Sequence, residues 1–385
     1  KNGPPATVSD IRQYDAATYD ANTKILNVSD LRLTGVYENV YPNTSTPAEI
    51  TVLGAKFTVL PSAASDLKSF KIGQTITLLL TVDGQVAGVV SNDTLRSNTV
   101  GVVSKIDSDG NATVDPLNTA LPSLSGKSSY SGAKAAQMEG QLVTVSSSSV
   151  DRINLSRLSG SGASSALDMG TGMMGNVSLA PNAVIYERVG TSKPQRIDVD
   201  DITCSTIPTS KILYAGKDYA GRINIMVLND VTGDQYTYGF VTYVDAYNNP
   251  ANEWDFRNAN VSVNNSQNSL GPLDCGVHFQ NGALMGIAAT LDGKKLAGSV
   301  ELIKVSGVSR SAFDMEAQTV TTPNMVLPIS DDVQCYNKTT KTWFGGEDTD
   351  PMDALNLARA FSETLTVYYD KAPEDGGKVR VVVAE

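Results

Sequence analysis

Residues that could perform acid–base or metal chemistry are few in this sequence. There is a single histidine, His278, between Val277 and Phe279 in CGVHFQNGALMG. A Ser-His-Asp or Cys-His nucleophile would have to use this residue, and no G-x-S-x-G turn is present to hold a serine. One histidine also cannot build an H-E-x-x-H zinc motif. We therefore expect His278 to be an ordinary strand residue.

Short matches to catalytic motifs occur in one polar tract. Ser131 and Lys134 satisfy S-x-x-K, and Tyr130 with Lys134 satisfies Y-x-x-x-K. The S-D-N and K-T-G partners of the first motif are missing, and no glycine-rich strand–helix turn precedes the second. We interpret both as chance matches in a loop rich in Ser, Gly and Lys.

Acidic residues gather in short turns. IDSDGNATV, with Asp107 and Asp109, begins like a calcium loop but lacks the closing Glu, so a hairpin turn explains it better. Two carboxylates from DVDD, SDD or GGEDTDP could serve as the acid and base of a glycosidase. Turns and helix caps are the commoner use of such residues. We predict no cofactor, and weak calcium binding stays open.

The aromatic residues are fifteen tyrosines and two tryptophans. Trp254 and Trp343 are the candidate ligand contacts, because a glycan-binding face needs exposed flat rings. Tyr236 and Tyr238 would share one side of an alternating strand, and Tyr243 and Tyr247 the other. Cross-strand packing is the prediction for these tyrosines.

Composition indicates a globular β protein. The 385 residues are 41% hydrophobic and 18% charged, and Ser, Thr, Asn and Gly dominate the polar remainder, which suits strands and turns. The net charge of −11 and the lack of a basic stripe argue against nucleic acid as a partner. No apolar run is long enough to cross a bilayer, so we predict no membrane insertion.

Three cysteines, Cys204, Cys275 and Cys335, are too few and too scattered for a disulfide framework or a zinc knuckle. We expect them to be buried as small apolar residues, with one disulfide left open. The first residues, KNGPP, lack an initiator Met, so we expect the chain to be a mature or excised piece of a longer protein.

Similar hairpin patterns recur along the chain. Apolar runs around an Asp/Gly turn span Ile72 to Val90, Lys211 to Leu228 and Thr364 to Val383. Short helical stretches, PSAASDLKSF and DTDPMDALNLARAF, precede the first and last. In the latter, Asp350 is placed as N-cap and Pro351 as the first helical residue.

Longer matches link the second and third repeats. TVGVVSKIDSDGNATV resembles TYGFVTYVDAYNNPANEWDF, GQLVTVSSSSV resembles GSVELIKVSGV, and SALDMGTGMMGNVSLAPNAVIYERVG resembles SAFDMEAQTVTTPNMVLPISDDVQCYNKT. We predict an all-β protein with a few short helices, in three tandem modules that are small barrels or sandwiches stacked in an elongated arrangement. The predicted modules are 1–97 with an irregular start, 98–235 with long Ser/Gly surface loops, and 236–385.

The first hairpin also carries a family resemblance. Its residues match the closing hairpin of β-rich repeats in S-layer-homology-type cell-surface proteins of anaerobic Gram-positive bacteria: Ile72, Gly73, Ile76, Leu78, Asp83, Gly84 and Val86. The helical wall-anchoring repeats of that family are not seen. The resemblance implies a secreted protein at the bacterial cell surface and supplies no catalytic residues.

We therefore expect a non-catalytic, extracellular structural or adhesive segment of a larger bacterial surface protein. Its partners would be cell-wall or surface-layer components, including glycans or sister subunits. The main alternative is a carbohydrate-binding module or glycan-active enzyme that uses exposed aromatics and loop carboxylates. A third alternative is a polymer subunit that pairs through an open edge at the Val-rich closing strand VRVVVAE.

Overall fold

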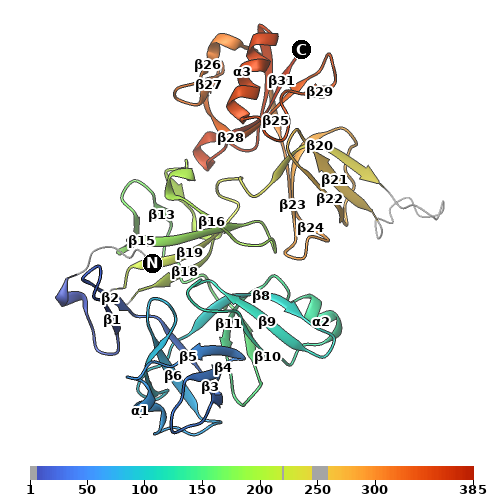
Figure 1. The fold of residues 1–385 in the computed structure, drawn as a ribbon. Helices are drawn as coiled ribbons and strands as arrows, with labels where there is room; N and C mark the ends of the chain where they lie inside the picture. The colour runs from blue at the N-terminus through green and yellow to red at the C-terminus, as the bar shows by residue number, and fades with distance from the viewer. Residues whose placement is uncertain (1–6, 219–220, 245–258) are drawn as a thin grey trace. The chain divides into compact units, whose positions relative to one another are not determined.

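The computed structural model describes residues 7–218, 221–244 and 259–385 (Figure 1). It is all-β with a few short helices, as the composition predicted, and the described strands form six sheets. The chain divides into two compact units, Lys1–Gly160 and Ser161–Glu385.

The first unit contains a separate hairpin and two five-stranded sheets. The hairpin is β1 (Ala16–Asp20) and β2 (Ile25–Ser29). The first sheet is β3 (Arg32–Tyr41), β4 (Glu49–Val52), β5 (Ala55–Thr58), β6 (Thr75–Leu80) and β7 (Val86–Ser91). The second is β8 (Thr99–Ile106), β9 (Asn111–Pro116), β10 (Leu124–Lys127), β11 (Leu142–Ser146) and β12 (Asn154–Arg157). Short helical turns complete the unit: η1 (Val8–Asp10), α1 (Ala64–Leu67) and α2 (Gly132–Ala136).

The two five-stranded sheets have the same strand order and one common core. The orders are β5-β4-β3-β6-β7 and β10-β9-β8-β11-β12, with the first strand of each set in the middle. One cluster of buried apolar side chains includes Leu33 and Ile76 of the first sheet together with Leu124 and Val143 of the second. The two sheets are therefore joined mainly by apolar burial.

The tract LPSLSGKSSYSGAKAA, residues 121–136, is one of the Ser/Gly-rich stretches that we predicted to be long surface loops of module 98–235, but it is part of this fold. It contains β10 and α2, and Leu124 and Ala135 are buried in the common core. The prediction was wrong because the apolar residues of the tract are too widely spaced to show a period. The place of Leu124 is set by the pairing of β10 with β9, which a local pattern does not reveal.

The second unit contains three sheets. The first is β13 (Leu167–Asp168), β14 (Met173–Met174), β15 (Val177–Arg188), β16 (Gln195–Ile197), β17 (Thr206–Ile207), β18 (Ile212–Lys217) and β19 (Ile223–Asn229), with turns η2 (Val199–Asp201) and η3 (Thr209–Lys211). The second is β20 (Thr237–Val244), β21 (Asn260–Asn264), β22 (Ser269–Asp274), β23 (Leu284–Ala289) and β24 (Leu296–Glu301). The third is β25 (Ile303–Ser309), β26 (Phe313–Asp314), β27 (Thr319–Thr321), β28 (Val326–Asn337), β29 (Thr342–Trp343), β30 (Thr364–Tyr369) and β31 (Val379–Ala384), with η4 (Arg310–Ala312), α3 (Pro351–Phe361) and η5 (Pro373–Asp375).

Two sheet designs recur. The middle sheet of the second unit, β22-β21-β20-β23-β24, repeats the strand order of the two five-stranded sheets described above. Both seven-stranded sheets pair a long strand in parallel with the last strand: β15 with β19, and β28 with β31. Each long strand carries a bulge at the same place, between Leu179 and Val184 on β15 and between Ile329 and Gln334 on β28. The predicted match between the SALDM and SAFDM segments is thus confirmed.

The other predicted matches are confirmed only in part. TVGVVSKI and TYGFVTYV are both the central strands of five-stranded sheets, as expected. The strand at GQLVTV, β11, corresponds by its pairing to β23 and not to the GSVELIKV segment. The hairpin from Ile72 to Val90 ends a five-stranded antiparallel sheet, whereas the other two closing hairpins lie beside a long parallel strand. Apolar runs around an Asp/Gly turn occur in both sheet designs, so this pattern could not distinguish the two kinds of hairpin.

The predicted module boundaries can be placed on these sheets. The boundaries at 97/98 and 235/236 both fall between sheets, while the boundary between the compact units, at Gly160, falls inside the predicted module 98–235. The predicted helix is present as α3: Asp350 accepts a hydrogen bond from the N–H of Met352 at 2.8 Å, and Leu355 is buried against the last sheet. The closing strand β31 pairs on both sides, with β30 and β28. The expectation of an open edge there was wrong.

Candidate functional site

The two candidate ligand contacts do not form an exposed platform in the described part of the chain. Trp343, on β29, is half-buried, and its ring centroid lies 5.0 Å from that of Tyr336 and 5.3 Å from that of Phe240. This aromatic cluster packs β20 against the last sheet. Trp254 lies outside the described residues, as does Tyr247. Trp343 therefore serves packing between sheets.

His278 lies in a loop and not in a strand. β22 ends at Asp274, and the exposed His278 ring stacks edge-on to the Tyr243 ring, with centroids 4.8 Å apart. The prediction of a strand failed because the apolar neighbours Val277 and Phe279 imitate strand alternation.

The acidic turns show no ion-binding geometry among residues 7–218, 221–244 and 259–385. Asp107 accepts hydrogen bonds from the backbone N–H groups of Asp109 and Asn111, as expected of a hairpin turn. No group of three or more His, Cys, Asp or Glu side chains in these ranges could hold a metal ion. In the same ranges no helix has the length and apolar character needed to cross a membrane.

The three cysteines are buried and unbridged, as small apolar residues would be. Burial raises the pKa of the Cys204 and Cys335 thiols. Neutral thiols are poor nucleophiles, so neither residue is suited to covalent catalysis.

The most unusual chemistry in the second unit is a set of buried charges around the segment that joins β19 to β20. Its centre is Arg380, in the Val-rich strand β31, whose side chain is 2% exposed. The guanidinium Nε donates to Oδ2 of Asp370 at 2.9 Å, and Nη1 donates to the Ser330 hydroxyl at 2.9 Å and to a carboxylate oxygen of Asp234. Nη2 donates to the backbone oxygen of Thr232.

Lys378 completes this group. Its ammonium lies 3.1 Å from Oδ2 of Asp234, and its backbone N–H donates to Oδ1 of Asp370 at 2.9 Å. The Tyr238 hydroxyl, from β20, donates to Oδ2 of Asp370 at 3.1 Å and to the Gly233 oxygen at 2.8 Å. We call Arg380, Lys378, Asp370 and Asp234 the Arg380 network. It contains two cations and two anions, so its charges balance.

Electrostatics favour the ionised forms of Asp234 and Arg380. Burial raises the pKa of Asp234, but the nearby charges of Arg380 and Lys378 outweigh it, so the pKa lies below its ordinary value. Burial lowers the pKa of Arg380, but interactions with Tyr238, Asp370 and Asp234 together raise it above its ordinary value. Burial also raises the pKa of Tyr238, which keeps its hydroxyl a donor to Asp370.

A buried glutamate fixes the other end of the same segment. Glu187, on β15, is fully buried and accepts hydrogen bonds from the N–H groups of Val231 and Thr232 and from the Thr232 hydroxyl. Burial raises its pKa, although these donors work in the opposite direction. The segment is therefore tied to the first sheet of the unit by Glu187 and to the last sheet by the Arg380 network.

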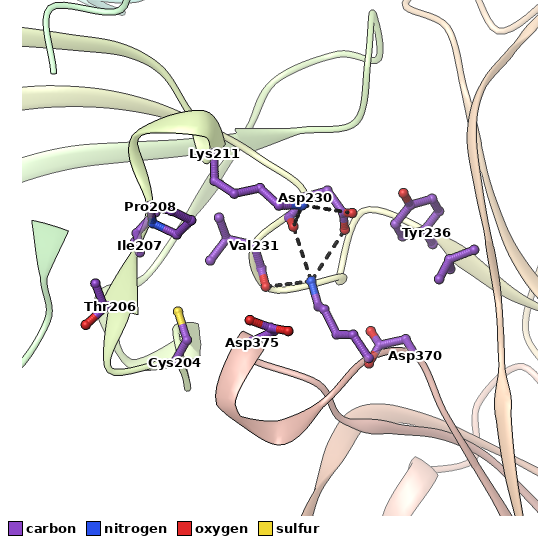
Figure 2. A pocket seen from close by; sticks show the side chains of 12 residues that line it. Cys204, Thr206, Ile207, Pro208, Lys211, Asp230, Val231, Tyr236, Asp370 and Asp375 are labelled. Carbon is purple, nitrogen blue, oxygen red and sulfur yellow. Dashed lines mark hydrogen bonds and ion pairs between the residues drawn. The ribbon is translucent and has the colours of Figure 1, made fainter. Parts of the chain in front are cut away.

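Beside the network lies a cavity of about 350 Å³ with mixed polar and apolar walls (Figure 2). Lys211 donates to the backbone oxygen of Asp230 at 2.9 Å. Lys371 donates to the same oxygen at 3.2 Å and to the Val231 oxygen at 2.7 Å. The lysines are thus engaged by the protein itself. With the neutral thiol of Cys204 in the wall, the cavity offers no activated nucleophile.

These residues were missed at the sequence level. Asp234, Asp370, Lys378 and Arg380 come from segments about 140 positions apart, so no local spacing reveals them. One signal was available: Lys378 and Arg380 lie in the otherwise apolar run KVRVVVA. A basic residue on the buried face of a strand needs an acidic partner.

Comparison with known proteins adds no assignment. No family model matches the chain, and neither the curated proteins nor the solved structures compared with it give a match.

Proposed function

We propose that this chain is a non-catalytic, load-bearing segment of a larger extracellular protein at the bacterial cell surface, associated with a surface layer. The observation that carries the proposal is the Arg380 network, whose buried ion pairs and hydrogen bonds tie the segment between β19 and β20 to the last sheet. The hairpin resemblance from Ile72 to Val86 supports a surface-layer setting. The described residues place no activated nucleophile in the cavity.

The strand order of the last sheet suits tension along the chain. β25 and β31 are both antiparallel to β30, so they point in the same direction. The chain enters this sheet at the start of β25 and leaves it at the end of β31. Tension would therefore pull these two strands toward opposite ends of the sheet. Because ladder hydrogen bonds lie across the strands, such a load is shared by many bonds at once.

Single-molecule pulling in two directions tests this role. Force applied between Glu301, before β25, and Glu385 loads the ladders in shear. Force applied between Glu363, before β30, and Glu385 acts at the open end of the last hairpin and opens the β30–β31 bonds one after another. We expect a clearly higher rupture force in the first direction. Equal rupture forces would remove the basis for a load-bearing role.

The cell-surface setting is tested separately. Intact cells that produce the full-length protein are treated with an amine reagent that cannot cross membranes, and the protein is then isolated. We expect its exposed lysines, such as Lys56 and Lys338, to be modified without lysis. Modification that occurs only after lysis would contradict an extracellular location.

The glycan-binding alternative has less support, because Trp343 is engaged in packing between strands. A pull-down with insoluble cell-wall polysaccharide distinguishes the two functions. We expect Trp343→Ala to leave any retention unchanged. Saturable retention that Trp343→Ala or Trp254→Ala abolishes would favour the glycan-binding alternative.

A further inference from the structure

The hairpin β1–β2 lacks the neighbouring strand that two similar hairpins, β18–β19 and β30–β31, have. It forms a two-stranded sheet on its own among the described strands, and an isolated hairpin is marginally stable in water. Three large apolar side chains near its turn are more than half exposed: Tyr19 at 63%, Ile25 at 53% and Leu26 at 52%. Adjacent exposed apolar side chains of this kind are typical of a surface that another segment covers.

The position of this hairpin in the chain matches that of β18–β19. Each hairpin is followed directly by the central strand of a five-stranded sheet, β3 after β2 and β20 after β19. The second hairpin closes a seven-stranded sheet, and β30–β31 closes another. The order of designs in the second unit is seven-stranded, five-stranded, seven-stranded, and in that unit the hairpin before the five-stranded sheet is the end of a seven-stranded one. The hairpin β6–β7 differs, since it ends one five-stranded sheet and precedes another, but it is already part of a complete sheet.

The end pairs of the two hairpins can be compared. Asp20 pairs with Ile25 as Lys217 pairs with Ile223, and Ala16 pairs with Ser29 as Ile212 pairs with Leu228, while β18–β19 carries two register shifts that the regular hairpin β1–β2 lacks. Ile223 is fully buried in its complete sheet, whereas its counterpart Ile25 is about half exposed. The difference is the long strand: β15 pairs in parallel with β19, and β28 with β31. No described strand occupies that place beside β2.

We propose that the free edge of β2, Ile25–Ser29, is the docking site of a further long, bulged β-strand, paired in parallel and supplied by polypeptide that precedes residue 1 in the intact protein. The source follows from the two complete sheets, in which the long strand comes before its hairpin in the chain. A parallel pair also requires a crossover connection of a dozen or more residues, so the strand cannot come from the hairpin itself. The strand would cover Ile25 and Leu26.

Hydrogen exchange tests the proposal. The intact protein encoded by the full gene is compared with the 385-residue chain, and exchange is followed for peptides covering Ile25–Ser29. We expect exchange at least about tenfold slower in the intact protein, since added ladder bonds protect amides from local opening. The matched control is β19, Ile223–Asn229, which already has its long strand and should exchange equally in both proteins.

Two substitutions sharpen the result. Leu26→Glu is made in both proteins. In the intact protein it should abolish the extra protection. In the 385-residue chain, where Leu26 is exposed, it should leave the circular dichroism spectrum unchanged. Tyr41→Glu, at another exposed apolar position, should preserve the protection. Equal exchange in the two proteins would overturn the proposal. So would protection that rises with the concentration of the 385-residue chain, which would assign the edge to a second copy.

Discussion

The two compact units differ in how they join their sheets: buried charges contribute to the joint in the second unit, whereas the first relies mainly on apolar burial. In the first unit, both five-stranded sheets contribute to one apolar cluster that includes Leu33, Ile76, Leu124 and Val143. In the second unit, each of the three sheets has its own apolar cluster, and a smaller cluster that includes Tyr238, Val381 and Trp343 joins the middle sheet to the last one. The segment between β19 and β20 is held by Glu187 on one side and by the Arg380 network on the other.

This difference separates two ways of making a joint. Apolar contacts are non-directional, so an apolar joint tolerates substitution as long as volume is kept. Buried charges bond in specific directions, and each depends on its partner. We infer that the second unit gains a defined sheet arrangement from its charges, at the cost of dependence on single residues.

The largest expected effect is at the centre of the network. Arg380→Met should lower the free energy of unfolding of the second unit by about 3–5 kcal/mol, because it removes the guanidinium from buried Asp370 and leaves Asp234 with Lys378 alone. Both tryptophans, Trp254 and Trp343, belong to the second unit, so urea unfolding followed by tryptophan fluorescence reports on this unit alone. A loss below about 1 kcal/mol, the range of exposed ion pairs, would show that the network does not hold the joint.

The matching test of the first unit is a core truncation. Leu124 is fully buried in the common apolar cluster, and Leu124→Ala should cost about 2–5 kcal/mol. In urea unfolding followed by far-UV circular dichroism, the transition of the first unit should move to lower urea concentration. The transition seen by tryptophan fluorescence should stay in place. A shift of the tryptophan transition would mean that the units do not unfold independently.

Acid should affect the contributions of two buried carboxylates, Asp234 and Glu38, in opposite directions. The folded pKa of Asp234 lies below its ordinary value of 3.8, so its contribution is present above pH 3.8 and lost as the pH falls through the folded pKa. In the first unit, burial raises the pKa of Glu38 above 4.5. Its ionisation therefore opposes folding, and the unfavourable contribution of Glu38 is relieved as the pH falls through that folded pKa.

The pH prediction is checked with Asp234→Asn. The variant should be less stable than the parent chain at pH 7, and the difference in the tryptophan transition should shrink below pH 3.8. Glu187, whose pKa burial also raises, contributes equally to both proteins and cancels in the comparison. A difference that stays constant down to pH 2 would contradict the assigned role of the Asp234 carboxylate.

The smallest effect should come from an exposed ion pair. Lys338 lies 2.7 Å from Glu385, but the two side chains are 62% and 51% exposed. Lys338→Met should leave the tryptophan transition where it is, in low and in high salt, because solvent screens such pairs. A shift comparable to that of Arg380→Met would remove the distinction between buried and exposed charges.

The sequence predicted what local patterns determine. Asp350 and Pro351 began a helix as expected. The segments around Leu179 and Ile329 were matched by their residue patterns, and the bulge that their long strands share confirms the match. It did not separate the two hairpin types, since the difference is a parallel partner far away in the chain. It also missed the Arg380 network, whose members meet only after the sheets have formed.

A double-mutant cycle between Arg380 and Asp234 tests the charged joint most directly. The free energy of unfolding of the second unit is measured for the parent chain, Arg380→Met, Asp234→Asn and the double variant, all at pH 7. We predict a coupling energy of about 1–3 kcal/mol, as expected for residues in one network. Strictly additive losses would contradict the claim that this ion pair joins the linking segment to the last sheet.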